Sequence, residues 1–67
     1  MSLMDAVTSL LSDPTHDAAV RVLRAADDGS EADRRSAVER LERHIQSEPD
    51  RRDAHVVGAL VALRRTT

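Results

Sequence analysis

Apolar residues recur three and four positions apart in four separate segments of the chain, which is the spacing of an amphipathic helix. Ser2, Ser30 and Asp50 each stand three residues before an aspartate, so each can cap a helix whose first turn holds that negative charge. Asp13 precedes Pro14, and proline is well tolerated as the first residue of a helix. We therefore predict four helices, over residues 3–11, 14–27, 31–47 and 51–65, separated at Ser12-Asp13, Asp28-Gly29 and Ser47-Glu48-Pro49.

These segments predict an all-α fold, because no run of residues combines alternating apolar and polar positions with the many β-branched residues of a strand. The breaks are short, so residues 1–67 form a single helical domain, either a small four-helix bundle or stacked helical hairpins. The predicted core stripes are Leu3, Val7, Leu10 and Leu11, then Ala19, Val22, Leu23 and Ala26, then Ala37, Val38, Leu41 and Ile45. On the outside of the third helix we predict the i,i+4 ion pairs Glu31–Arg35, Arg35–Glu39 and Glu39–Arg43.

The fourth helix differs from the others because Val56 to Leu63 contains no polar side chain on any face. A helix that is apolar all round must be covered on both sides. Ala54, Gly58 and Ala62 form a smooth stripe along which another backbone could approach closely, and larger apolar residues occupy the far side. Glycine inside a helix costs about 0.5–1 kcal/mol relative to alanine. We therefore expect Gly58 to pack closely against a neighbouring helix.

A chain of 67 residues with no aromatic residue and no cysteine has little material to cover such a helix. We therefore predict a non-enzymatic protein–protein interaction or oligomerisation module, which forms a homodimer or docks on a larger protein through this helix. The predicted contact residues are Val56, Val57, Gly58, Leu60, Val61 and Leu63, with Arg51, Arg52, Arg64 and Arg65 as a polar rim.

The second half of the chain resembles the junction between two tetratricopeptide repeats. The resemblance rests on small and large residues at the spacing of that family, namely Ala37, Leu41, Ile45, Pro49, Ala54 and Ala59. His44 and Gly58 stand where that family usually has a small residue and a leucine. The resemblance covers residues 36–65 and implies a helical hairpin that binds other proteins.

A second resemblance supports an alternative function. Leu11 to Thr15, Val22 to Arg24 and Asp28-Gly29 are similar to the second helix of small winged-helix repressors. This resemblance implies a compact helix-turn-helix transcriptional regulator whose fourth helix enters the major groove of DNA. The apolar run of that helix offers no side chain to read base edges, and a net charge of −2 does not favour a polyanion. Nucleic acid is therefore not the partner that we expect.

Catalytic, metal and cofactor patterns are absent from the sequence. His16, His44 and His55 show no zinc-ligand spacing, and the two glycines are too isolated to form a phosphate loop. We expect His44 and His55 to be partly buried and able to meet across a hairpin; a metal shared between them or with Glu48 is a minor alternative. The predicted protein has no enzymatic activity and no cofactor.

Charge is unevenly distributed between the two halves of the chain. Residues 1–33 carry seven acidic and two basic residues, a balance of −5, whereas residues 34–67 carry eight basic and five acidic residues, a balance of +3. The two halves could therefore attract each other within one molecule or between two copies.

No signal-peptide pattern is present, and eight apolar residues are fewer than the roughly 20 that span a bilayer. Arginine as the sole basic residue besides histidine is typical of a GC-rich prokaryotic genome, so we expect a cytoplasmic prokaryotic protein.

Overall fold

The computed structural model describes residues 2–49 and 53–66, and these form four helices. The helices are α1 (Leu3–Ser12), α2 (His16–Asp28), α3 (Glu31–Ser47) and α4 (Ala54–Thr66). No strand occurs within the described ranges. The all-α, four-helix prediction is therefore confirmed. The predicted last residues of the first three helices agree with the observed ones to within one residue.

Side-chain caps begin α1 and α3 where the sequence predicts them. The Ser2 hydroxyl accepts a hydrogen bond from the backbone N–H of Asp5 at 3.2 Å, and the Ser30 hydroxyl accepts one from Asp33 at 3.1 Å. Each bond satisfies one N–H group that has no partner inside the helix, and each aspartate places negative charge at the positive end of the helix dipole.

The starts of α2 and α4 differ from the prediction. Helix α2 begins at His16 rather than Pro14, because the Thr15 hydroxyl caps it by accepting from the N–H of Ala18 at 3.1 Å. Helix α4 begins at Ala54 in the described chain, and Asp53 caps it through Oδ1, which accepts from the N–H groups of His55 at 2.7 Å and of Val56 at 3.3 Å. The predicted cap Asp50 and the predicted first residues, Arg51 and Arg52, lie outside the described residues.

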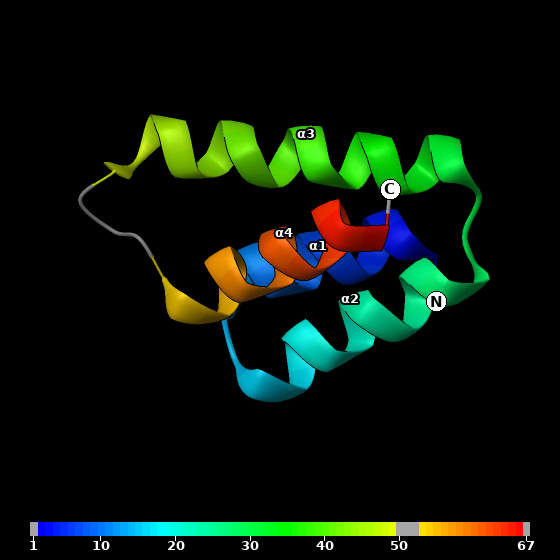
Figure 1. The fold of residues 1–67 in the computed structure, drawn as a ribbon. Coiled ribbons are helices and arrows are strands. Elements are labelled where there is room, and N and C mark those ends of the chain that lie inside the picture. The colour runs from blue at the N-terminus through cyan, green and yellow to red at the C-terminus, as the bar shows by residue number, and fades with distance from the viewer. Residues whose placement is uncertain (1, 50–52, 67) are drawn as a thin grey trace.

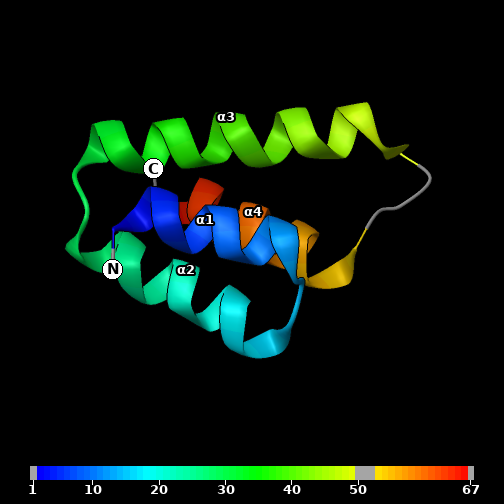
Figure 2. The ribbon, with the colours of Figure 1, turned by 180° about the vertical axis from the view of Figure 1, so that it is seen from behind.

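The four helices form an up-and-down arrangement in which each helix packs on two others. Helix α1 packs against α2 and α3, and α4 packs against the same two helices. Consecutive helices run in opposite directions, so α1 and α3 run in parallel, as do α2 and α4 (Figure 1). Helices α1 and α4 lie on opposite sides of the bundle, between α3 and α2, as the two opposite views show (Figure 2).

The core is built from small and medium apolar side chains contributed by all four helices. Its most completely buried large side chains are Val7, Leu10, Val22, Leu41, Val56 and Leu63. No polar or charged residue is buried among the described residues. Most predicted stripes are confirmed, but α2 is rotated from its predicted orientation. Ala18 is buried in place of Leu23, which is 36% exposed, because α2 turns its alanine-rich side towards its neighbours.

Arg34 ties the start of α3 to the end of α2, a role that its position in the sequence did not suggest. Its Nη1 donates hydrogen bonds to the carbonyl oxygens of Ala26 at 3.1 Å and Gly29 at 2.6 Å. These carbonyls lie at the C-terminal end of α2, where helix carbonyl groups lack internal partners. The guanidinium group therefore satisfies the end of one helix and fixes the turn into the next.

The ion pairs differ from the predicted set. Glu31–Arg35 is present at 3.4 Å between exposed side chains. The predicted Arg35–Glu39 and Glu39–Arg43 pairs are not among those formed by the described residues, so that part of the prediction is wrong. Arg64 of α4 instead reaches Glu42 of α3 at 3.7 Å. Exposed pairs of this kind contribute little stability, at most about 1 kcal/mol.

Candidate interaction surfaces

The inner face of α4 belongs to the core of the chain itself. Val56, Leu60 and Leu63 are 2%, 8% and 1% exposed, and Ala59 lies among them. These residues follow the i, i+4, i+7 spacing of one helix face, which points towards α2 and α3. Three of the six apolar residues that we predicted to bind a partner are therefore covered within the folded chain, and that part of the prediction is corrected.

The opposite side of α4 is also apolar and is not covered by the chain. We define the outer face of α4 by five residues: Ala54, Val57, Gly58, Val61 and Ala62. Ala54, Gly58 and Val61 are exposed, and Val57 and Ala62 are half-buried along the two edges. Val61 is 46% exposed, the larger exposure of the two exposed large apolar residues in the described chain. This face is thus a continuous apolar ridge open to solvent.

Gly58 has no structural reason within the chain to be glycine. Its backbone lies inside α4, and no glycine of the described chain has a positive φ. A Cβ atom added at Gly58 would meet nothing within 4 Å. Gly58 therefore packs on no helix within the described chain, because Ala59 occupies the inner face and Gly58 points outward. Its close packing against a helix of another molecule stays a prediction. The destabilising effect of the glycine is not offset by any contact inside the molecule.

The rim of this face is only partly described. Arg64 and Arg65 lie in the last turn of α4, where positive charge interacts favourably with the helix dipole. Arg64 is engaged with Glu42, and Arg65 is exposed. The other two predicted rim residues, Arg51 and Arg52, lie outside the described residues. The described rim therefore places its positive charge at the C-terminal end of the outer face.

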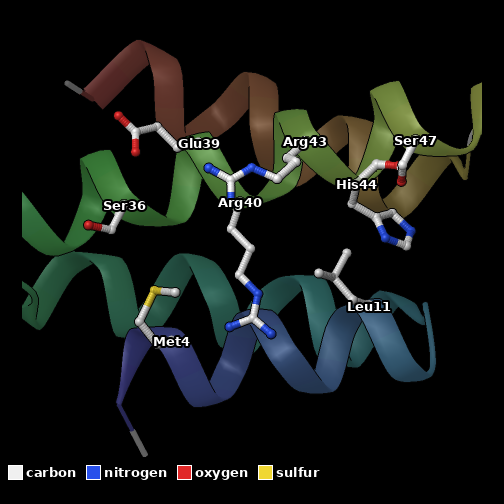
Figure 3. Close-up of a pocket in the computed structure, with 8 residues that line it drawn as sticks. All are labelled: Met4, Leu11, Ser36, Glu39, Arg40, Arg43, His44 and Ser47. Atoms are coloured by element: carbon white, nitrogen blue, oxygen red, sulfur yellow. The ribbon is translucent and has the colours of Figure 1, made fainter.

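A hollow lies on the other side of the bundle, between α1 and α3. We call it the α1/α3 groove; its volume is about 630 Å³ (Figure 3). Met4 and Leu11 of α1 line it together with a polar set on α3, namely Ser36, Glu39, Arg40, Arg43, His44 and Ser47. None of the predicted contact residues lies in this groove. The available signal was the i, i+4, i+7, i+11 spacing of Ser36, Arg40, Arg43 and Ser47, which marks a single polar edge of α3.

The predicted partial burial of two histidines is confirmed for His44 and wrong for His55. His55 is exposed rather than partly buried, and its ring lies edge-on to that of His16, with 6.4 Å between the ring centroids. His44 is half-buried and lines the α1/α3 groove and, with Glu48, a smaller cavity of about 210 Å³. No group of three or more metal-ligating side chains occurs within the ranges 2–49 and 53–66.

The helix-turn-helix alternative gains no support from these surfaces. The part of the chain that the structure describes contains no strand pair that could serve as a wing. The residues of α4 that face solvent between Val56 and Leu63 carry no polar side chain able to reach a base edge. DNA binding stays a prediction from sequence resemblance.

Comparisons with known proteins identify no relative. No protein-family model matches the chain, and no curated protein or solved structure matches it either. The resemblance to tetratricopeptide repeats is therefore neither supported nor contradicted. No helix among the described residues is both long enough and apolar enough to cross a membrane.

Proposed function

We propose that this chain is a non-enzymatic protein–protein interaction module that self-associates through the outer face of α4. The observation that carries the proposal is the open position of Gly58 beside the exposed Val61 on a ridge without polar side chains. A helical glycine with no contact inside its own chain is explained if another molecule occupies the space beside it. Apolar surface that is exposed in the monomer then becomes buried on association.

The sequence of the outer face suits an antiparallel pair of α4 helices related by a two-fold axis. With the axis between residues 58 and 61, Val61 of each copy lies over Gly58 of the other. A contact of this kind is reciprocal and closes on itself, so it produces a dimer rather than a filament. Glycine and alanine at the crossing let two helix axes approach to about 8 Å, the short end of the usual range.

The same pairing places opposite charges near each other. Arg65 of one copy would lie beside the N-terminal end of α4 in the other copy, where Asp53 provides the cap. This contact is exposed, so we expect it to fix the direction of pairing more than to add affinity. It also gives the uneven charge of the described rim a role in the interface.

The small size of the outer face of α4 sets the expected affinity of the dimer. Helix α4 has 13 residues and is therefore about 20 Å long. One helix face of this length buries less than the roughly 800 Å² per partner of a standard stable interface. We therefore expect a dissociating dimer with a Kd in the micromolar range, equivalent to about 8 kcal/mol.

The proposal is tested by placing a charge at the centre of the outer face. Val61→Glu should shift the sedimentation of the protein to that of a monomer at concentrations where the unmodified chain is dimeric, because the carboxylate would be buried against an apolar helix. Leu23→Glu is the matched control, since Leu23 lies on α2 and is the other exposed large apolar residue of the described chain.

Circular dichroism should show that both variants keep the helical content of the parent chain. The control should dimerise like the parent, because α2 takes no part in the contact. Dimerisation of Val61→Glu with unchanged affinity would contradict the proposal. Equal loss of dimer in both variants would also contradict it, because the effect would then not be specific to α4.

A further inference from the structure

The α1/α3 groove combines an apolar floor with a charged wall. Met4 and Leu11 form the floor; both are half-buried and pack against the hydrophobic core. Figure 3 shows the side chain of Arg40 extending from α3 towards α1, between Met4 and Leu11. The floor is therefore divided by a guanidinium group that presents hydrogen-bond donors into the hollow.

The two arginines of the wall differ from the other arginines of α3. Arg34 bonds to the end of α2, and Arg35 pairs with Glu31. Arg40 and Arg43 form no ion pair with any residue of the described chain, and both are exposed. Glu39 also lines the groove, but its carboxylate points away from α1 in Figure 3. Two guanidinium groups are thus free to bind an anionic partner.

The dimensions of the wall suit a short helix. Ser36 and Ser47 mark its ends, 11 residues apart on α3, which corresponds to about 16 Å or three helical turns. A helix of that length presents two or three apolar side chains along one face. Methionine adapts its shape readily to such side chains, so Met4 suits a floor that receives them.

We propose that the α1/α3 groove binds an acidic amphipathic helix of a partner protein. The apolar face of that helix packs on Met4 and Leu11, and carboxylates along its edge pair with Arg40 and Arg43 in charge-assisted hydrogen bonds. Charge complementarity selects this occupant, because the wall carries two unpaired arginines against one glutamate, Glu39, whose carboxylate points away from α1. The groove lies on the opposite side of the bundle from α4, so it stays open when the outer face is covered.

The test uses a fluorescein-labelled helical peptide of about 12 residues, with leucine at i, i+3, i+4 and i+7 and glutamate at most other positions. Binding to the full chain is followed by fluorescence anisotropy at about 50 mM and about 300 mM NaCl. These concentrations lie below and above the physiological ionic strength of about 150 mM, so they vary how strongly salt screens the charges. The double variant Arg40→Glu with Arg43→Glu removes both positive charges from the groove. The matched control is Arg21→Glu with Arg24→Glu on α2, which changes the net charge equally but lies outside the groove.

We expect saturable binding by the parent chain and by the Arg21/Arg24 control, and at least a tenfold weaker Kd for the Arg40/Arg43 variant, because two ion pairs become repulsive. A peptide with lysine in place of glutamate should bind at least tenfold more weakly than the acidic peptide. The proposal is overturned if no saturable binding occurs up to about 1 mM, the limit of weak specific affinity. It is equally overturned if both double variants lose the same affinity, or if the lysine peptide binds as well as the acidic one.

This inference does not depend on dimerisation through α4. Val61→Glu should leave the affinity for the acidic peptide within about twofold of the parent value, because the two surfaces share no residue and distant sites behave independently. Failure of the peptide to bind would leave the dimer result unaffected. Loss of the dimer in Val61→Glu with retained peptide binding would separate the two functions experimentally.

Discussion

Gly58→Ala should change folding and association in opposite directions. The substitution adds one methyl group at a helical position where a Cβ atom meets nothing within 4 Å. In the isolated chain it therefore gains the helix preference of alanine without a steric penalty, which stabilises the fold by about 0.5–1 kcal/mol. For a domain of this size, that corresponds to a rise in Tm of about 2–8 °C.

In the proposed dimer the same methyl group would occupy the space into which Val61 of the second copy packs. Overfilling a close contact typically costs about 1–3 kcal/mol. The Kd of the dimer should therefore rise by about 5-fold to 150-fold, at 1.4 kcal/mol for each factor of ten. Gly58→Ala should thus stabilise the fold of the monomer but weaken the association of two copies.

Two measurements test this pair of predictions. Thermal unfolding by circular dichroism in dilute solution, where the chain is monomeric, gives the change in Tm. Sedimentation velocity over a range of higher concentrations gives the change in Kd. Gly29→Ala is the control, because a Cβ atom at Gly29 would lie 3.3 Å from the carbonyl oxygen of Ala25, so we expect no gain in Tm. A higher Tm together with unchanged or tighter dimerisation would refute the proposed packing at Gly58.

Two further predictions concern the fold itself. Leu41→Ala should destabilise the chain by about 2–5 kcal/mol in urea unfolding, because Leu41 is 0% exposed at the centre of the bundle and its removal leaves a cavity; a change below about 1 kcal/mol would show that the core is not packed as described. Arg34→Met should destabilise by about 1–3 kcal/mol, because it removes the hydrogen bonds to Ala26 and Gly29 at the end of α2. Arg35→Met is its control, since Arg35 makes a single exposed ion pair, and equal losses in the two variants would rule out the anchoring role of Arg34.

The sequence predicts most of the fold because the signals that start and end its helices are local. Ser2 and Ser30 cap helices by contacts within three residues, and apolar spacing decides which face of α1 and α3 is buried. The start of α2 was misplaced because Asp13-Pro14 and Thr15 are competing signals two residues apart. The structure uses Thr15, whose hydroxyl reaches the N–H of Ala18.

The candidate sites were harder to predict because they depend on how the helices pack. An apolar stretch such as Val56 to Leu63 shows that α4 has two apolar faces, but not which of them the chain covers. The structure buries Leu60 and leaves Val61 exposed. The spacing of polar residues on α3 marks only one wall of the α1/α3 groove, because Met4 and Arg40 are brought together by the parallel packing of α1 and α3.

The most direct test of self-association through α4 is the absolute mass of the unmodified chain in solution. Multi-angle light scattering after size exclusion should be measured over about a hundredfold range of concentration, centred on the micromolar Kd expected for a small interface. The proposal predicts a mass that rises from the chain mass of 7.4 kDa towards twice that value as the concentration increases. A mass that stays at 7.4 kDa over the whole range would contradict it.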